Sequence, residues 1–197
     1  MDYLFFDCET TGLPHSRNQS VHDVGGWPRL VQLGWAVYDS SRIVRESHSF
    51  IVRPSGFSIP VEASRIHGIT HAEAVSAGDD VEKVLARFTA ATHRGRITLV
   101  AHNLDFDRGV VGAELVRLRL LGSFLCLPAV CTMKTTTDLC RIPKQHGSGY
   151  KWPKLQELHE HLFGEEYRDA HDAVADLEAC ARCFFELRRS GHIQGYQ

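Results

Sequence analysis

Five side chains in three short stretches could together bind divalent cations and activate water. The stretch LFFDCETTGLP contributes two carboxylates, LVAHNLDFDRGVV contributes a third, and AHDAVADLEA contributes a histidine and a fourth carboxylate. In chain order these residues are Asp7, Glu9, Asp107, His171 and Asp176. Carboxylate oxygens are the ligands that hard cations such as Mg²⁺ and Mn²⁺ prefer. Because metal ions beside a water-activating group can hydrolyse a phosphodiester bond, the set predicts metal-assisted hydrolysis.

Asp7 and Glu9 stand at the end of an apolar stretch, residues 3–7, that is expected to be a strand. Side chains two residues apart on a strand point to the same face, so these carboxylates repel each other unless a cation lies between them. A solvated pair at a strand end is the alternative interpretation. The apolar strand favours a metal site, because it places both carboxylates at the mouth of a core sheet.

Asp107 lies in the first turn of a helix predicted to follow a compact apolar strand, residues 97–101. Asp105 is expected to cap this helix, and acidic groups in a first turn also favour the helix dipole. Asp107 is the metal candidate, because it leaves the same sheet edge as Asp7 and Glu9.

His171 and Asp176 are five residues apart. On a helix this spacing is a rotation of about 500°, or roughly 140° around the axis, which is too far for a mutual contact. The pattern instead predicts a histidine at the helix start and a carboxylate that faces the metals further along. A loop histidine and a surface charge are the alternative.

The hydrophobic pattern predicts an α/β fold that positions these clusters. Strands are expected at residues 3–7, 30–39, 48–52, 97–101 and 129–132, and helices at 79–93, 105–121, 154–162 and 170–189. An antiparallel start followed by alternating helices and strands predicts a mixed five-stranded β-sheet flanked by α-helices. Two irregular stretches, residues 15–29 and 141–153, are long enough to be functional loops.

Composition indicates one globular domain over residues 1–197, because apolar residues make up 43% and no Pro/Gly/Ser linker divides the chain. The net charge of −2 argues against binding nucleic acid through overall charge, but not against a local basic rim. Such a rim is available between Cys131 and Lys154, where five lysines and arginines face one aspartate.

The sequence has no apolar run of membrane-spanning length and no export signal ahead of its first strand. Its six cysteines lack the spacing of a disulfide framework. We therefore expect reduced thiols, no membrane association and a cytoplasmic location.

The segments LFFDCETTGLP, AHNLDFD and HDAVAD resemble the three motifs of the DEDDh exonucleases, the 3′-5′ exonucleases of the proofreading-subunit, RNase T and oligoribonuclease type. The resemblance covers nearly the whole chain, and RIHGIT, residues 65–70, is similar to a segment of the proofreading branch. The His-to-Asp spacing resembles the histidine branch, whereas the sister branch carries a tyrosine at the position of Asp172. An RNase H-like fold is implied.

The resemblance also implies roles for the five residues and two divalent metal ions, Mg²⁺ or Mn²⁺. Asp7, Glu9 and Asp176 would bind the catalytic metal, with Asp7 bridging to a second one. Asp107 would hold that second metal directly or through water. His171 would be the general base, because an imidazole pKa lies near working pH.

The resemblance also implies substrate contacts. The candidates are Thr10, Thr11 and Leu13 for the terminal nucleotide, His67 for the 3′ end, and His102 and Asn103 for phosphate. Leu13 would wedge against the last base. For His67, His102 and Asn103 a structural role remains the alternative. The lysines of the basic loop, with Tyr150 and Trp152, could guide a strand by charge and stacking.

The function expected from the sequence is a metal-dependent 3′-5′ exonuclease that removes nucleoside 5′-monophosphates from single-stranded 3′ ends, with DNA favoured over RNA. The alternatives are an RNA-trimming exoribonuclease and a catalytically silent nucleic-acid-binding module. A polymerase or another DNA-processing complex is a possible partner.

Overall fold

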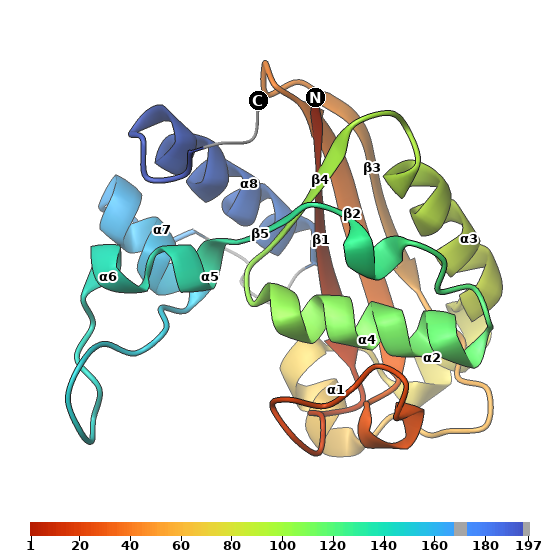
Figure 1. Ribbon diagram of the computed structural model, residues 1–197. Coiled ribbons are helices and arrows are strands. Elements are labelled where there is room, and N and C mark those ends of the chain that lie inside the picture. Colours follow the sequence, from red (N-terminus) through yellow and green to blue (C-terminus); the bar gives the residue numbers. More distant parts are fainter. Residues whose placement is uncertain (168–172, 195–197) are drawn as a thin grey trace.

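The computed structural model describes residues 1–167 and 173–194, and a five-stranded sheet forms its centre (Figure 1). The strands are β1 (Asp2–Thr10), β2 (Leu30–Asp39), β3 (Val44–Ile51), β4 (Ile97–Ala101) and β5 (Ala129–Cys131). They lie in the order β3-β2-β1-β4-β5. β2 pairs antiparallel with β1 and β3, whereas β4 pairs parallel with β1 and β5. The predicted mixed five-stranded sheet is therefore confirmed.

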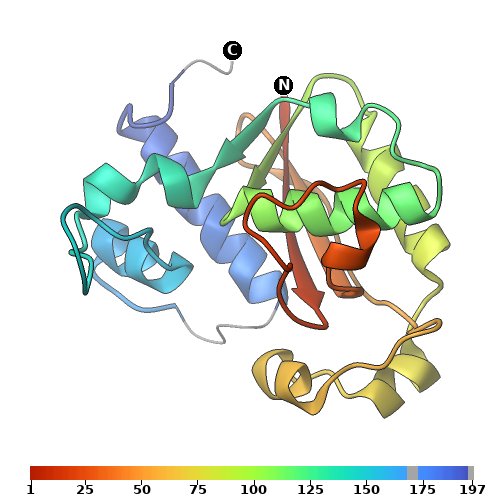
Figure 2. The same cartoon turned by 60° about the horizontal axis from the view of Figure 1, so that its bottom comes forward.

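Helices cover both faces of this sheet (Figure 1, Figure 2). The α-helices are α1 (Val61–His67), α2 (His71–Ala77), α3 (Val81–Thr92), α4 (Leu104–Arg117), α5 (Thr132–Thr135), α6 (Thr137–Cys140), α7 (Leu155–Phe163) and α8 (Ala173–Arg189), with short 3-10 turns η1 (Val24–Gly26) and η2 (Phe124–Cys126). α3 and α4 pack on one face, and α7 and α8 pack on the other.

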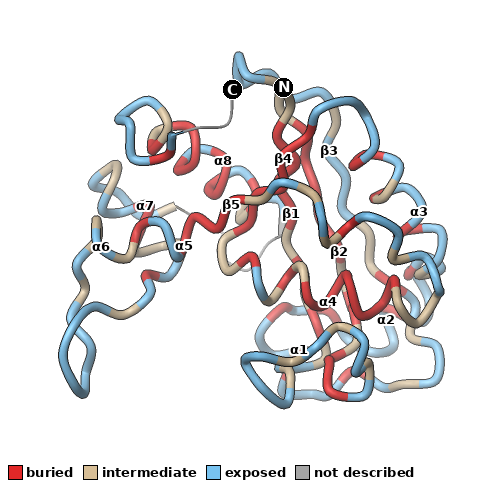
Figure 3. The backbone as a smooth tube through the Cα atoms, viewed as in Figure 1, coloured by how far each residue is buried: buried red, intermediate tan, exposed pale blue. Residues whose placement is uncertain are grey.

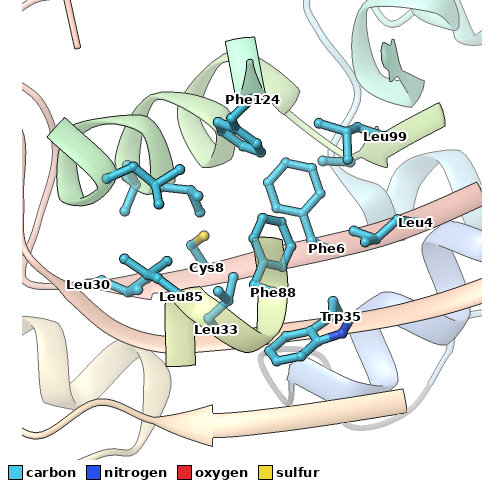
Figure 4. Close-up of a cluster of buried hydrophobic side chains, with 14 of the residues drawn as sticks. Leu4, Phe6, Cys8, Leu30, Leu33, Trp35, Leu85, Phe88, Leu99 and Phe124 are labelled. Atoms are coloured by element: carbon cyan, nitrogen blue, oxygen red, sulfur yellow. The ribbon is translucent and has the colours of Figure 1, made fainter. Parts of the chain in front are cut away.

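The alternation of β1 side chains explains this layering, because successive residues of a strand point to opposite faces. Leu4, Phe6 and Cys8 join the core beneath α3 and α4, which Figure 4 shows around Phe6. Tyr3 and Phe5 join the core beneath α7 and α8. Since both faces are buried, the strand reads as an unbroken apolar run rather than an alternating one.

Several elements differ from the sequence expectation. α1, α2, α5 and α6 were not predicted, because each has seven residues or fewer and cannot show a repeated apolar period. β3 begins at Val44 rather than at residue 48, because its outer residues are exposed and polar. The N-cap of α4 is Asn103, in the left-handed region, so the expectation that Asp105 caps this helix is wrong.

Within residues 1–167 and 173–194, no helix combines the length and the apolar character needed to cross a membrane.

The topology brings the predicted clusters to one edge of the sheet. β1 and β4 are parallel, so their carboxyl ends lie at the same edge. α4 begins three residues after β4, and α8 covers the face of β1 that carries Tyr3 and Phe5. Alternate residues of β1 point to the same face, so Asp7 and Glu9 lie on the face of Tyr3 and Phe5, which α8 covers.

Candidate active site

Asp7 and Glu9 share their surroundings with Asp176, which lies in the first turn of α8. Burial, followed by the charge of Asp176, raises the pKa of Asp7 to about 7. Burial, followed by Asp7 and Asp176, raises the pKa of Glu9 to about 8. The three carboxylates are therefore close enough to destabilise one another's charged forms.

Asp107 reaches the same place from α4. Asp107 is 2% exposed, and its Oδ1 accepts a hydrogen bond of 3.1 Å from the backbone N–H of Cys8. Cys8 is the residue between Asp7 and Glu9 on β1. Burial and then the charge of Asp7 raise the pKa of Asp107 well above its ordinary value. One hydrogen bond thus ties the start of α4 to the carboxyl end of β1.

Asp176 has a hydrogen-bond donor that sequence reasoning missed. The Tyr167 hydroxyl donates to Asp176 Oδ1 at 2.6 Å. The Tyr167 ring lies edge-on to His159, with ring centroids 5.4 Å apart, and His159 is 1% exposed. Burial and the bond to Asp176 raise the pKa of Tyr167. No spacing rule links Tyr167 to Asp176, so the sequence offers no signal for this contact.

The donor set fits a divalent cation in its chemistry. Four carboxylates supply only oxygen atoms, and burial and mutual repulsion raise pKa values in the group, which a bound cation would offset. As the side chains stand, the described residues include no group of three or more His, Cys, Asp or Glu arranged so that it could hold a metal ion.

His171, the predicted general base, lies outside the described residues.

The predicted terminal-nucleotide residues follow β1 directly. Thr10 is buried, and its hydroxyl donates to the Gly12 carbonyl at 2.7 Å. The Thr11 hydroxyl accepts a bond of 2.9 Å from the Arg29 N–H. Leu13 is 81% exposed. The two threonines thus fix the turn, and an apolar side chain projects from it into solvent.

His67 is buried at the end of α1, where its Nδ1 accepts a bond from the Ile69 N–H at 3.1 Å. Its Nε2 is buried and makes no hydrogen bond of good geometry among the described residues, although the Thr10 backbone is near enough to raise the pKa of the ring and partly oppose the effect of burial. Burial lowers its pKa, so the ring favours the neutral form. A neutral, unpartnered nitrogen beside Thr10 is a group that a bound 3′ hydroxyl could satisfy.

His102 and Asn103 occupy the turn between β4 and α4. Both ring nitrogens of His102 have protein partners, Thr132 Oγ1 and the Pro153 carbonyl, each at 3.0 Å. Burial lowers the pKa of His102 to about 4. A phosphate contact would break one of these bonds, so the geometry favours the turn-stabilising alternative for His102. Asn103 lines a pocket beside the carboxylates.

A buried ion cluster, also missed from the sequence, anchors residues 15–29. The Glu114 side chain is 2% exposed and pairs with Arg29 at 2.8 Å and Arg117 at 3.1 Å. It also accepts a bond from the Leu30 N–H. Arg117 in turn donates to the carbonyls of Val24 and Trp27. The only sequence signal was a glutamate inside an apolar stretch of the α4 helix.

The chain matches a known family over most of its length. Residues 4–184 fit the RNase_T family, which is described as Exonuclease. Among curated relatives, the DNA polymerase III PolC-type of Streptococcus thermophilus is 29% identical over 183 residues. That of Listeria monocytogenes is 26% identical over 185 residues. The alignments cover 93% and 94% of this chain, which spans only 11% of the length of either relative.

Solved structures share the architecture. E. coli Exonuclease I in complex with a dT13 oligonucleotide superposes with a TM-score of 0.74 at 20% identity, over 95% of this chain and 41% of that chain. An ExoI/SSB-Ct complex gives a TM-score of 0.72 at 20% identity, over 96% and 41%. At these identities the likeness establishes the fold, and the predicted RNase H-like fold is confirmed.

Proposed function

This chain belongs to the DEDDh branch of the Exonuclease family, and from that premise we propose that it is a metal-dependent 3′-5′ exonuclease. It would release nucleoside 5′-monophosphates from single-stranded 3′ ends. One observation carries the proposal: Asp7 and Glu9, Asp107 and Asp176 come from three elements and meet at the carboxyl edge of β1, where they raise one another's pKa values. A carboxylate with a purely structural role is normally paired with a lysine or arginine, which lowers its pKa rather than raising it.

Each carboxylate has a task that its position supports. Asp7, Glu9 and Asp176 would hold one cation, and Asp107 would hold a second beside Asp7. Bound Mg²⁺ or Mn²⁺ would neutralise the phosphate and lower the pKa of water. The backbone N–H of Cys8 orients Asp107 through one hydrogen bond, and the Tyr167 hydroxyl orients Asp176 through another.

His171 is proposed as the general base on the strength of its motif. A side chain that takes a proton from water at neutral pH needs a pKa near 7, and imidazole meets this requirement. Asp7 and Glu9 would instead serve as cation ligands, which favours their ionised forms and makes them weaker bases.

The terminal nucleotide would lie against the turn after β1. Leu13 projects from that turn and can separate the last base from its neighbour, while the unpartnered Nε2 of His67 can hydrogen-bond the 3′ hydroxyl. Selection of the 3′ end would follow, because only a terminal nucleotide carries that hydroxyl.

DNA is the favoured substrate. The curated relatives are DNA polymerases, and an Exonuclease I structure of the same fold holds a DNA oligonucleotide. The polymerase relatives also support a role at 3′ ends that a polymerase has made. The test below compares DNA with RNA and therefore decides between these two substrates.

The test uses 5′-labelled DNA and RNA strands of one sequence with Mg²⁺, Mn²⁺ or EDTA, resolved on a denaturing gel. We expect a metal-dependent ladder that shortens from the 3′ end, faster on DNA. Asp7→Ala should abolish it, and a Glu160→Gln variant on the exposed side of α7 is the matched control. A faster RNA ladder would assign the exoribonuclease alternative, and an active Asp7→Ala protein would contradict the metal site.

A further inference from the structure

The two irregular segments of the chain, residues 15–29 and 141–153, meet at a pocket beside the carboxylates. Arg17 from the first segment lies over the ring of Trp152 from the second, with the guanidinium carbon 5.8 Å from the ring centroid. The pocket has a volume of about 450 Å³, within the range of small-ligand sites. Figure 2 shows the first segment lying beside α4, and Figure 3 shows how exposed the second one is.

The lining of this pocket combines flat apolar groups with cations. Leu13, Trp27 and Phe106 contribute apolar surface, and Trp152, a residue that is 48% exposed, contributes a flat ring. Asp105 is the acidic residue of the lining. Lys134 lies 5.9 Å from the centroid of the same ring. A planar aromatic group with an attached negative charge matches this lining, because the ring stacks and the charge meets the cations.

Both cations can be redirected to such a ligand. Lys134 pairs with Asp105, but the two side chains are 44% and 63% exposed, and exposed pairs are weak. Arg17 is exposed and lies over the Trp152 ring with its guanidinium carbon 5.8 Å from the centroid, near the outer limit of a cation–π contact. A ligand can therefore replace the guanidinium on the indole while a phosphate of the same ligand holds the guanidinium nearby.

The pocket adjoins the candidate active site without containing it. Leu13 and Asn103 line the pocket, whereas within the described part of the chain none of the four carboxylates does. With the terminal nucleotide against Leu13, as proposed above, a group bound in this pocket belongs to the next part of the strand rather than to the scissile phosphate.

We propose, on the basis of the exonuclease function above, that this pocket binds an unpaired nucleotide of the substrate strand inward of the terminal one. Its base stacks on Trp152, and its phosphate is held by Arg17 and Lys134. A base within a duplex has both faces covered by its neighbours and cannot stack on the indole. The junction of residues 15–29 with residues 141–153 thereby selects single strands, DNA or RNA, without reading sequence.

The test moves one abasic site stepwise inward from the 3′ end of a 5′-labelled oligothymidylate and measures kcat/KM at each position. The wild-type protein should lose about tenfold at one position inward of the terminal nucleotide, the usual scale for one stacked base. Trp152→Ala should lower kcat/KM on the intact strand by about the same factor and abolish the dependence on abasic position. Arg17→Ala should increase the KM for the intact strand.

His146→Ala is the matched control, because His146 is exposed on the same hairpin and the pocket lining does not include it. It should keep the wild-type position profile. The inference is overturned if Trp152→Ala keeps that profile or if His146→Ala also abolishes it. An oligouridylate series with the same abasic positions decides whether RNA uses the pocket.

A binding measurement distinguishes failure of the proposed exonuclease function from failure of the proposed pocket. If the wild-type protein releases no nucleotide, the same abasic series is titrated by fluorescence anisotropy. A position-dependent affinity that Trp152→Ala abolishes would support the pocket alone, and uniform affinities would overturn it.

Discussion

The Tyr167 hydroxyl donates a hydrogen bond to one oxygen of Asp176, Oδ1. A carboxylate that binds a metal through one oxygen commonly accepts a hydrogen bond on the other, which fixes its orientation. The tyrosine ring is itself held against the buried His159, whose Nδ1 bonds the Glu165 carbonyl at 2.9 Å. Tyr167 is thus a positioning residue for Asp176, provided that Asp176 binds metal as proposed.

Tyr167→Phe should therefore weaken Mn²⁺ binding by about tenfold, the lower end of the effect of losing such an outer partner. The aromatic ring is retained, so the melting temperature in EDTA should change little. Isothermal titration with Mn²⁺ measures the affinity, and Tyr150→Phe on the exposed hairpin is the control. An unchanged Mn²⁺ affinity would show that the hydroxyl does not orient Asp176.

At the scale of elements, Glu114 on α4 organises the segment between β1 and β2. Its carboxylate binds Arg29 and Arg117, which in turn reach the backbone of Val24 and Trp27. Trp27 then lies directly over α4, where a Cβ at Gly109 would come within 1.9 Å of its ring. The segment that carries Leu13 and Arg17 is thus attached to the helix that carries Asp107.

Glu114→Gln should lower the free energy of unfolding by about 2 kcal/mol, because it leaves two partly buried guanidinium groups without their counter-charge. The loosened segment should also be cut faster by trypsin after Arg17. Urea unfolding and timed proteolysis measure the two effects. Glu160→Gln, on an exposed face of α7, should change neither. Equal proteolysis rates would mean that the cluster does not anchor the segment.

At the scale of the whole molecule, the carboxylate cluster makes metal-free stability depend on pH. The folded-state pKa values of Asp7 and Glu9, about 7 and 8, exceed their ordinary values of 3.8 and 4.5. Their contribution to stability is thus present at low pH and is lost as the pH rises through 7 and 8. The pKa of His102 is lowered from 6.5 to about 4, so its contribution is lost below pH 6.5 instead.

The free energy of unfolding in EDTA should consequently fall between pH 6.5 and 8.5, by up to about 1.4 kcal/mol per pH unit for each protonated carboxyl. Urea unfolding at several pH values measures this slope. Mn²⁺ should flatten it, because cations stabilise the ionised carboxylates. In the double variant Asp7→Asn, Glu9→Gln, the free energy of unfolding should also depend less steeply on pH. Stability that rises over this pH range in EDTA would contradict the raised pKa values.

The local pattern of the sequence determined the mixed sheet and the family motifs. Leu30–Asp39 and Ile97–Ala101 were predicted with the bounds they have, because buried strands are rich in apolar residues and a local pattern reveals them. The roles of Asp7, Glu9, Asp107, Asp176 and His171 stay predictions. The sequence suggests these roles because each motif is a short run. It contains both the reactive side chains and the hydrophobic pattern of the strand or helix that carries them.

Only the tertiary structure decided the contacts between distant segments. The bond of Tyr167 to Asp176, the pairing of Glu114 with Arg29, and the meeting of Arg17 with Trp152 join residues that no period or motif relates. The two partners of His102 also arise this way. A sequence pattern reports on neighbours along one element, whereas these contacts depend on how the elements pack across the sheet edge.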